Sequence, residues 1–587
     1  MIKTKNKYQK LFSPRSIAIV GASNKKGTIG NVLVKNITKL GYAGEVFFVN
    51  PSYNILNWKR CYKSLENIKR PVDLAIIAIP AKFVIETIEK AAGIIKNYIV
   101  ISAGFSEIGE DGARHEKELA TLAKKYKLNI LGPNCLGFIA PKLKLNASFA
   151  GGMPAEGNIA FVSQSGALAV ALMDRAKEEH LGFSNIISVG NKMEIDETEL
   201  LEYLLEDKKT KVIGMYLEGI KNGRKFLEIA KKASLKKPIV ILKAGKTAKA
   251  QQAISSHTGA LAGSDEIVDV AFKSAGIIRA NNLEEFFNLL GMISFTQAPK
   301  NNKVAVVTNA GGAGVLTTDA FKGKEIELAE LDKKVKEELK KQLPSESSVE
   351  NPIDLLGDAH EDRYRNILKL INKKNIGSVI CVLTPQEQTP VEKIASSIVE
   401  AKKNGDSLVL TAFIGGERTK EAALGLKQNN IPNFSDPESA VNALDKYYKW
   451  NVFSKTKTVS SRKNISAKRR KQIAEIIGKA AGQKRTALLF PEAAEIMQKY
   501  GIDCVQSWAV LPNAGAPEIF CYPLAVKVDS DKVLHKSDKQ ALILNLKNKK
   551  ALDLAIRKLQ KDFPGTQLVI QAMQDKQVEI ILGDQKR

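Results

Sequence analysis

Short, largely apolar runs recur along the chain, and stretches with helical periodicity separate them. The first runs cover residues 16–20, 45–49 and 74–79, and residues 31–40 form an intervening stretch with helical periodicity. Runs of about four to eight apolar residues are typical of strands that are buried on both faces, as in parallel sheets. Strands that alternate with helices therefore predict an α/β protein with doubly wound parallel sheets.

The apolar runs group into successive segments. Residues 1–140, 150–295 and 300–450 each alternate predicted strands with helices, and residues 486–587 carry a predicted helix and further strands. A chain of 587 residues agrees with several domains, because single domains usually have about 100–200 residues. Residues 451–485 are rich in Lys and Arg. We interpret them as a linker with a solvated helix face rather than as a polyanion-binding patch.

Lys and Arg outnumber Asp and Glu by 89 to 63, which gives a formal net charge of +26. Such a charge is compatible with binding of nucleic acid or small polyanions, but the basic residues are dispersed and no nucleic-acid-binding motif is evident. No apolar run approaches the ~20 residues of a membrane span, and no signal segment follows the N-terminus. The five cysteines lack CxxC spacing, so neither zinc nor disulfides are indicated. We expect a cytoplasmic protein that binds neither nucleic acid nor membranes.

The first glycine-rich turn, residues 21–30, connects a predicted strand with a predicted helix. Gly27 and Gly30 let the backbone approach a phosphate, and the helix N-terminus offers N–H donors. A site for NAD would need an acidic residue at the end of the second strand, where this chain has Asn50 and Pro51. The turn therefore favours another adenine nucleotide carrier over NAD, with a ligand-free structural turn as the alternative.

Two further turns share one design, in which a strand runs into a small-residue loop that opens a helix. Each offers free N–H groups and the positive end of a helix dipole, equivalent to roughly half a charge. Two such helix starts that face each other could bind a phosphoryl group without a metal, although each alone is compatible with a structural turn. The residues concerned are Ser163, Gln164, Ser165, Gly166, Asn309, Gly311, Gly312, Ala313 and Gly314.

His257 lies among small residues in the segment 255–263, which leaves room for a tetrahedral group on its ring. An imidazole is a nucleophile near neutral pH, because its unperturbed pKa is about 6.5. The attacking nitrogen must be unprotonated, so the other ring nitrogen needs an orienting acceptor. Glu218, at the end of the predicted strand 212–217, is our candidate for this acceptor. By itself, the segment favours a histidine that has only a structural role.

Several short motifs follow one another in a fixed order along nearly the whole chain, namely Ile17–Ser23, Gly132–Gly137, Ser163–Gly166, Tyr216–Gly219, Ser256–Ala260, Asn309–Gly314 and Asn351–Asp354. Together they resemble the ADP-forming acyl-CoA synthetases, relatives of succinyl-CoA synthetase. The resemblance implies an acid–thiol ligase. Its order of domains would be a Rossmann-like CoA-binding domain, two flavodoxin-like ligase domains and a partial ATP-grasp domain.

The resemblance implies a phosphate relay. Acyl-CoA and phosphate would give an acyl phosphate, which phosphorylates His257 and releases the carboxylic acid, and the phosphate would then pass to ADP. Glu218 matches the acidic partner of that histidine, and the two helix starts match the pair that holds the phosphate. The residues that match positions near CoA are Gly21, Ala22, Ser23, Gly27, Thr28, Gly30, Asn50, Pro51 and Asn134.

The last segment resembles the start of an ATP-grasp domain. His535 matches a second phosphate-carrying histidine, and Lys527 matches a lysine that binds nucleotide phosphate. The chain departs from the family pattern at Gln540 and Ala541, where a Gly-Gly pair is usual, and it stops soon after the apolar run 578–583. We therefore expect the ATP-grasp domain to be incomplete and the acidic ligands of Mg²⁺ to be missing from this chain. A homo-oligomer, or a partner chain that supplies the rest of this domain, is expected.

Three alternatives to an acyl-CoA ligase stay open at this point. The first is a non-catalytic CoA-binding or regulatory protein that retains the relay domains and lacks a working ATP-grasp lobe. The second is a NAD-linked dehydrogenase, which Asn50 and the segment around His257 disfavour. The third is a nucleic-acid binder, which rests on charge alone.

Overall fold

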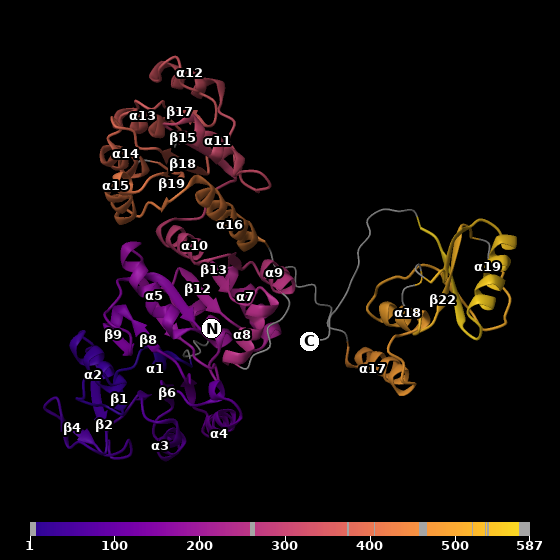
Figure 1. Ribbon diagram of the computed structural model, residues 1–587, viewed down its shortest axis with the longest axis horizontal. Coiled ribbons are helices and arrows are strands. Elements are labelled where there is room, and N and C mark those ends of the chain that lie inside the picture. The colour runs from indigo at the N-terminus through magenta and orange to yellow at the C-terminus, as the bar shows by residue number, and fades with distance from the viewer. Residues whose placement is uncertain are drawn as a thin grey trace. The chain divides into compact units, whose positions relative to one another are not determined.

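The computed structural model describes residues 7–258, 265–371, 375–403, 405–456, 466–518, 521–533, 536 and 539–574. The chain forms two compact units, Met1–Thr456 and Lys457–Arg587. In Figure 1 the first unit runs from indigo through magenta to orange, and the second unit ends in yellow. Each unit is described by itself.

The first unit begins with an α/β domain that contains a seven-stranded sheet (Figure 1). Its elements are α1 (Gln9–Phe12), β1 (Ser16–Val20), α2 (Ile29–Lys39), β2 (Glu45–Val49), β3 (Ile55–Leu56), β4 (Lys59–Tyr62), β5 (Leu74–Ile77), η1 (Ala81–Phe83), α3 (Val84–Ala91), β6 (Asn97–Val100), η2 (Ser106–Ile108), α4 (Glu110–Tyr126) and β7 (Asn129–Leu131). The strand order is β3-β4-β2-β1-β5-β6-β7. β1 pairs in parallel with β2 and β5, and all its residues are buried, as expected for a run that is apolar after its first residue, Ser16.

A second α/β domain follows, again with one seven-stranded sheet. Its elements are β8 (Gly137–Ala140), η3 (Pro141–Leu143), β9 (Leu145–Ser148), β10 (Glu156–Ser163), α5 (Gly166–Glu178), β11 (Phe183–Ser188), α6 (Glu197–Glu206), β12 (Val212–Leu217), α7 (Gly223–Ser234), β13 (Ile239–Lys243), α8 (Ala248–Thr258), α9 (Asp265–Ser274), β14 (Ile278–Ala280) and α10 (Leu283–Phe295). The order is β14-β13-β12-β10-β11-β8-β9. The hairpin β8–β9 adds antiparallel strands to an otherwise parallel sheet.

The third α/β domain has a fully parallel sheet in the order β16-β15-β18-β19-β20, with β17 paired to β15. Its elements are β15 (Lys303–Thr308), α11 (Gly311–Asp319), β16 (Glu327–Leu328), α12 (Lys333–Gln342), β17 (Ile353–Asp354), α13 (Glu361–Ile371), β18 (Ser378–Leu383), α14 (Val391–Lys403), β19 (Leu408–Phe413), α15 (Glu417–Gln428), β20 (Asn433–Phe434) and α16 (Pro437–Lys455). The predicted fold class, α/β with parallel sheets, is confirmed.

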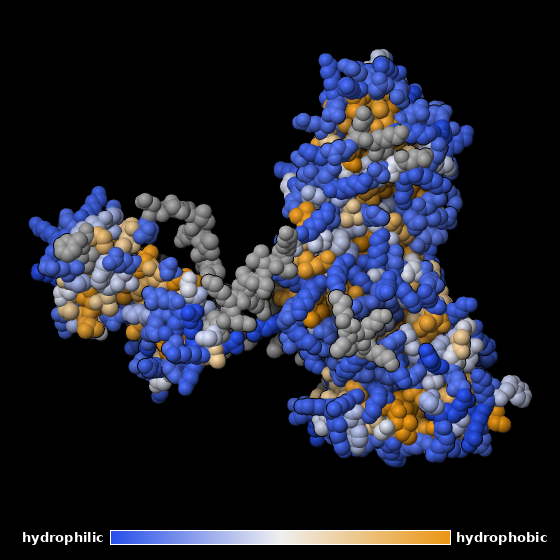
Figure 2. All heavy atoms as spheres, turned by 180° about the vertical axis from the view of Figure 1, so that it is seen from behind, coloured by the Kyte–Doolittle hydropathy of each residue, from blue (hydrophilic) through white to orange (hydrophobic). Residues whose placement is uncertain are grey.

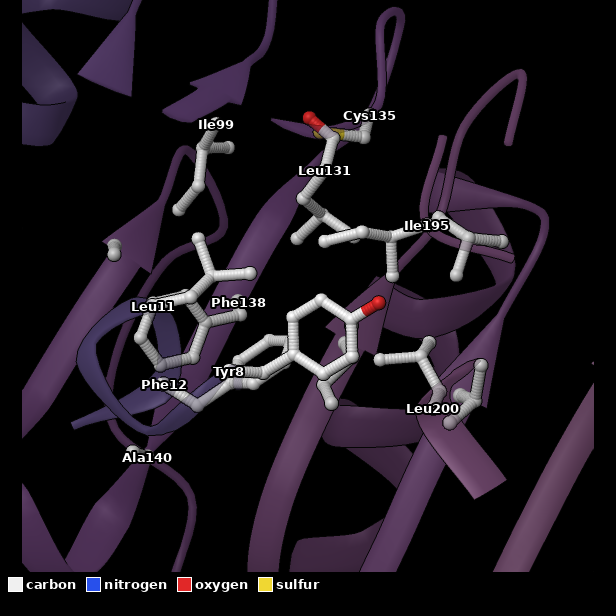
Figure 3. Packing of buried hydrophobic residues seen from close by; sticks show 14 of the residues in the cluster. Tyr8, Leu11, Phe12, Ile99, Leu131, Cys135, Phe138, Ala140, Ile195 and Leu200 are labelled. Atoms are coloured by element: carbon white, nitrogen blue, oxygen red, sulfur yellow. The ribbon is translucent and has the colours of Figure 1, made fainter. Parts of the chain in front are cut away.

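Apolar contacts join these domains within the first unit. Phe12 of α1 lies edge-on to Phe138 of β8 with ring centroids 5.4 Å apart, and its ring is 4.6 Å from that of Tyr203. Figure 3 shows Phe12 and Leu11 packed among buried side chains of both the first and the second domain. The first two domains therefore share one cluster of buried hydrophobic residues.

The second and third domains meet through helices. α10 packs against α16, and Trp450 of α16 donates a hydrogen bond of 2.8 Å from its indole nitrogen to the Ser234 carbonyl. Lys427 of α15 pairs with Glu179, which follows the last residue of α5. The C-terminal end of α5 therefore faces the third domain.

The second unit has a four-stranded antiparallel sheet in the order β21-β24-β22-β23. Its elements are α17 (Ala467–Gly482), α18 (Phe490–Lys499), β21 (Ser507–Val510), β22 (Leu524–Asp529), β23 (Leu542–Leu546), α19 (Lys549–Asp562) and β24 (Gln567–Ala572). α17 occupies part of the predicted linker 451–485, and only Ile473 and Ala480 of this helix are buried, which agrees with a solvated helix face.

The charged residues leave a largely polar surface. The face drawn in Figure 2 is mostly hydrophilic and interrupted by separate apolar patches. Throughout the described ranges, none of the helices combines the length and the apolar character that crossing a membrane requires.

Candidate active site

A cavity of about 830 Å³ lies between the first and second domains. Its walls come from the segments that follow strands in both sheets: residues 79–80 after β5, 101–103 after β6, 164–167 after β10, 190–192 after β11 and 218–221 after β12. Ligands of open α/β sheets bind at the carboxyl ends of the strands. The cavity therefore occupies the position where this fold places a binding site.

The predicted turn 163–166 lines this cavity through Gln164, Ser165 and Gly166. Ser165 caps α5, because its side chain accepts a hydrogen bond from the backbone N–H of Leu168. The first N–H groups of a helix have no intrahelical acceptor, and the dipole makes this end positive. The start of α5 can therefore hold an anion of phosphate size in the cavity.

Glu218 lines the same cavity and is tied to that turn. The side-chain oxygen of Gln164 accepts hydrogen bonds from the backbone N–H of Glu218 at 2.8 Å and of Gly219 at 3.2 Å. The Tyr216 hydroxyl lies 3.5 Å from Oε1 of Glu218 and donates to it. Burial, and next the charge of Glu218, raise the pKa of Tyr216 to about 12, so the hydroxyl keeps its proton at neutral pH. Two of the predicted elements are thus brought together.

An amide and two carboxylates form another part of the cavity region. Nδ2 of Asn191 donates to Glu107 at 2.6 Å and to Glu116 at 2.8 Å, and its Oδ1 accepts from Asn134 at 3.3 Å. Burial alone would raise the pKa of Glu107. Hydrogen bonds from Asn191 and from the backbone N–H groups of Gly104 and Phe105 outweigh it and lower that pKa below its ordinary value. The Glu107 carboxylate therefore stays ionised.

The lysines at the cavity are held by protein groups. Nζ of Lys192 lies 3.0 Å from Oε2 of Glu197, and both side chains are almost fully buried. Nζ of Lys221 donates to the carbonyls of Lys192 at 3.2 Å and of Met193 at 2.9 Å. These cations therefore hold the loops that carry Glu218 and Asn191 in place.

Sequence reasoning missed Asn191, Glu107, Glu116 and Lys192. Asn191 and Lys192 follow the predicted strand 186–189, and polar residues directly after a parallel strand are the signal that could have found them. Glu107 and Glu116 have no such signal, because they reach the site only through the folding of η2 and α4 beside it.

A second cavity, of about 420 Å³, lies in the first domain and shares Ile79 and Pro80 with the first cavity. Gly21, Asn50 and Pro51 line it, as do two lysines and two glutamates, Lys63, Lys90, Glu66 and Glu86. Of the other predicted CoA positions, Asn134 lines the first cavity. The remaining ones, which line neither of these two cavities, are Ala22, Ser23, Gly27, Thr28 and Gly30.

The turn from β1 into α2 requires two of its glycines for close packing. Gly21 has φ +89°, and a Cβ there would lie 2.3 Å from the carbonyl oxygen of Ala78. A Cβ on Gly30 would lie 1.9 Å from the carbonyl oxygen of Gly21. The glycines let the start of α2 approach β1 and β5, as in dinucleotide-binding turns. Backbone packing therefore requires glycine at both positions of this turn.

The second predicted phosphate-binding turn, residues 309–314, does not line either cavity. Asn309 is buried and exchanges two hydrogen bonds of 2.9 Å with the backbone of Thr384, whereas Gly311 and Gly312 are exposed. α5 has 13 residues, so its two ends are about 20 Å apart. Its N-terminal end lines the first cavity, whereas its C-terminal end contacts the third domain.

The predicted phosphate carrier His257 belongs to α8, but its side chain lies outside the described residues, as do residues 259–264. α8 packs beside η2, and Ser106 of η2 lines the first cavity. The helix that carries His257 therefore approaches the wall of this cavity.

The nucleotide-binding residues were predicted in the second unit. His535 lies outside the described residues. Lys527 is on β22, and its Nζ is 4.4 Å from the ring centroid of Phe490. Burial lowers the pKa of Lys527. Among the residues that the structure describes, no group of three or more His, Cys, Asp or Glu is arranged to hold a metal ion.

Four family models match the chain. They are a CoA binding domain at residues 15–141, a succinyl-CoA ligase like flavodoxin domain at 156–293, a ligase-CoA domain at 304–457 and an ATP-grasp domain at 479–586. Fold, cavities and these matches together define a CoA-dependent ligase.

Comparison with known proteins shows which ligases this chain resembles. Acetate–CoA ligase (ADP-forming) I of Archaeoglobus fulgidus is 36% identical over 590 residues, which covers 98% of this chain and 84% of that protein. The alpha subunit of acetate–CoA ligase (ADP-forming) II of Pyrococcus furiosus is 42% identical over 440 residues, which covers 74% of this chain and 95% of that subunit. The solved structure of dinucleotide-forming acetyl-coenzyme A synthetase 1 of Ca. Korarchaeum cryptofilum, with phosphate and ADP, matches with a TM-score of 0.73 and 35% identity, over 76% of this chain and 98% of that chain.

The chain belongs to the family of ADP-forming acyl-CoA ligases. The predicted family and the predicted class of enzyme, an acid–thiol ligase, are confirmed. The CoA-binding and ATP-grasp domains imply CoA and an adenine nucleotide as ligands.

Proposed function

We propose that the protein interconverts an acyl-CoA, ADP and phosphate with a carboxylic acid, CoA and ATP, through an acyl phosphate and a phosphohistidine at His257. The observation that carries this proposal is the link from Gln164 to the backbone of Glu218. This link connects the N-terminal end of α5, which can bind phosphate, with the Glu218 carboxylate, which can accept a hydrogen bond from a histidine. Both lie in the first cavity, which shares a wall with the second cavity.

The relay is a series of displacements that begins at the acyl group and ends at ADP, and a second histidine carrier would add one further transfer between two ring nitrogens. An oxygen of phosphate attacks the acyl carbonyl carbon, and the C–S bond breaks so that the CoA thiolate leaves. The unprotonated ring nitrogen of His257 then attacks phosphorus, and the P–O bond to the acyl group breaks so that the carboxylate leaves. Finally, an oxygen of the terminal phosphate of ADP attacks phosphorus, the P–N bond breaks, and ATP is formed.

The start of α5 is proposed to hold the phosphoryl group during the first two displacements. Backbone N–H groups that are fixed before the reaction stabilise developing charge without reorganisation. Ser163 supports this geometry, because its hydroxyl donates to the Ser165 carbonyl at 2.6 Å and accepts from the Ser165 N–H at 3.2 Å. Ser163, Gln164, Ser165 and Gly166 thus form one rigid phosphate-binding turn.

Glu218 is proposed to orient His257. A carboxylate that accepts the N–H of one ring nitrogen keeps the other nitrogen unprotonated and stabilises the cation that forms when this nitrogen attacks. The donation from Tyr216 occupies Oε1 and leaves Oε2 for the histidine. Glu218 therefore acts as the positioning carboxylate of the phosphate carrier.

CoA is proposed to bind across the two cavities, with its nucleotide end near Gly21, Asn50 and Pro51 and its thiol end toward Asn134. Their shared wall at Ile79 and Pro80 supports this path. Ala22, Ser23, Gly27, Thr28 and Gly30 would shape the turn around the phosphates. Five free cysteines accord with a reducing, cytoplasmic location as part of this proposal.

The transfer to the nucleotide is proposed to use the second unit. Lys527 would bind the phosphates of the nucleotide, and His535 would be a second phosphate carrier. Mg²⁺ would enter with the nucleotide, and no residue of this chain is assigned to it.

A homo-oligomer is also proposed, with a separate partner chain as the alternative. The support is the position of the turn 309–314, which the orientation of α5 leaves outside the cavity. A second copy could present this turn, with Asn309, Gly311, Gly312, Ala313 and Gly314, to the phosphate. Sedimentation of the full chain at assay concentrations is expected to show an oligomer, and an active monomer would contradict the proposal.

The activity itself is tested by incubating the full chain with acetyl-CoA, phosphate and ADP. We expect ATP and free CoA thiol to form in equal amounts and only when phosphate is present. A folded preparation that binds CoA but forms neither product would contradict the proposal. It would support the alternative of a non-catalytic CoA-binding or regulatory protein.

A further inference from the structure

The peptide segment Glu218–Gly219 has all four of its backbone polar groups bound by side chains. Gln164 accepts from both N–H groups. Nζ of Lys243 donates to the Glu218 carbonyl at 2.8 Å, and Nζ of Lys192 donates to the Gly219 carbonyl at 2.7 Å. A peptide segment whose N–H and C=O groups are all hydrogen-bonded has little freedom to shift. The backbone that carries the Glu218 carboxylate is therefore fixed in position.

Lys243 is the less expected member of this set. It is the last residue of β13 and is only 6% exposed. Within the described part of the chain it has no carboxylate at ion-pair distance, and its other acceptor is the Ala244 carbonyl at 2.5 Å. By contrast, Lys192 is paired with Glu197. Burial of a cation whose contacts are carbonyls rather than a carboxylate is costly. Burial lowers the pKa of Lys243, and the more distant charges of Asp265 and Glu218 offset this only in part.

Costly burial of an ionisable side chain is common at functional sites. Here both of its carbonyl partners lie at the cavity end of the sheet: one belongs to Glu218, and the other belongs to the residue after β13. The Lys243 cation therefore connects the ends of β12 and β13 at Glu218, the proposed partner of His257.

We propose that Lys243 is a positioning residue for phosphoryl transfer, which acts by holding the Glu218 backbone against the phosphate-binding turn. This inference rests on the proposed role of Glu218. A shift of about 1 Å in a reacting group can cost about 100-fold in rate, so loss of this anchor is expected to slow the chemical step and to leave CoA binding unchanged.

The chain offers a matched control in Lys237. Its Nζ also donates to two carbonyls, those of Leu204 and Asp207, at 2.7 and 2.6 Å, and burial lowers its pKa too. Lys237 precedes β13 and lies at the opposite end of the strand from Lys243. A purely structural lysine and the proposed positioning lysine can thus be compared within one domain.

The experiment compares Lys243→Met and Lys237→Met in the full chain with acetyl phosphate as phosphoryl donor. We expect Lys243→Met to lower the rate of histidine phosphorylation about 10- to 100-fold with an unchanged Kd for CoA. Lys237→Met should keep a rate near that of the wild type. Equal rates for the two variants would overturn the inference. If the wild-type protein is not phosphorylated at all, the proposed function is wrong. This outcome differs from equal rates in the two variants, which would overturn only the role of Lys243.

A double variant separates positioning from general weakening of the fold. If Lys243 acts through Glu218, Lys243→Met should cause little further loss in the Glu218→Gln background, because contacting residues in one network are not additive. A full additional loss would contradict the inference. Should Lys243→Met fail to fold, Lys243→Gln, which keeps one donor, is expected to give an intermediate rate, and a wild-type rate in that variant would overturn the proposal.

Discussion

Replacement of His257 by Ala is expected to reduce ATP formation from acyl-CoA, phosphate and ADP to below about one thousandth of the wild-type rate. Alanine offers no nitrogen to accept the phosphoryl group, and water in the same cavity would only hydrolyse the acyl phosphate. The first displacement does not involve His257. Acyl phosphate formed from acetyl-CoA and phosphate should therefore still be trapped as hydroxamate.

The control for this substitution is His115→Ala, which changes an exposed histidine on α4. It should leave both the trapped acyl phosphate and the ATP yield near wild-type levels. Substantial ATP formation by a folded His257→Ala variant would show that the phosphate reaches ADP by another route.

Replacement of Glu218 by Gln is expected to lower the rate of histidine phosphorylation by about 10²- to 10⁴-fold, the range typical of a positioned acid or base. Gln keeps the size of the side chain and leaves the backbone contacts with Gln164 in place. It removes the negative charge that stabilises the histidine cation. Rapid-quench measurement with labelled acetyl phosphate gives the rate, and equilibrium dialysis should show unchanged affinity for CoA.

Glu178→Gln on α5 is the matched substitution, because this residue is exposed near the far end of the helix from the cavity. It should not alter the rate. If Glu218→Gln and Glu178→Gln behave alike, the carboxylate of Glu218 has no part in the transfer, and the pairing of this residue with His257 is wrong.

Much of the fold follows from the pattern of apolar residues. The run 16–20 is apolar except for its first residue, and the structure buries all of it in the middle of a parallel sheet. The glycine-rich turn after it predicts a close approach of backbone segments, and the contacts of Gly21 and Gly30 explain why these positions tolerate no side chain. Local chemistry was sufficient for these features.

The arrangement of the residues in the site was harder to predict from the sequence than the fold. Gln164 and Glu218 are 54 residues apart, and only the adjacency of β10 and β12 in the sheet brings them into contact. Lys192 and Lys243 could not be distinguished among so many lysines, because both hold the Glu218–Gly219 segment through its backbone carbonyls, and a contact with a carbonyl leaves no trace in the sequence. The turn 309–314 looked equivalent to 163–166 in sequence. Its distance from the cavity depends on which end of α5 faces the third domain.

The central claim is that this cavity serves a phosphate carried on His257. Its most direct test is to expose the full chain to acetyl phosphate labelled in the phosphoryl group, and to map the label by peptide analysis under alkaline conditions. Within the first unit, one acid-labile, alkali-stable phosphate is expected, on His257, and none is expected in the His257→Ala variant. Label on another residue of the first unit, or no label in a folded protein that binds CoA, would contradict it.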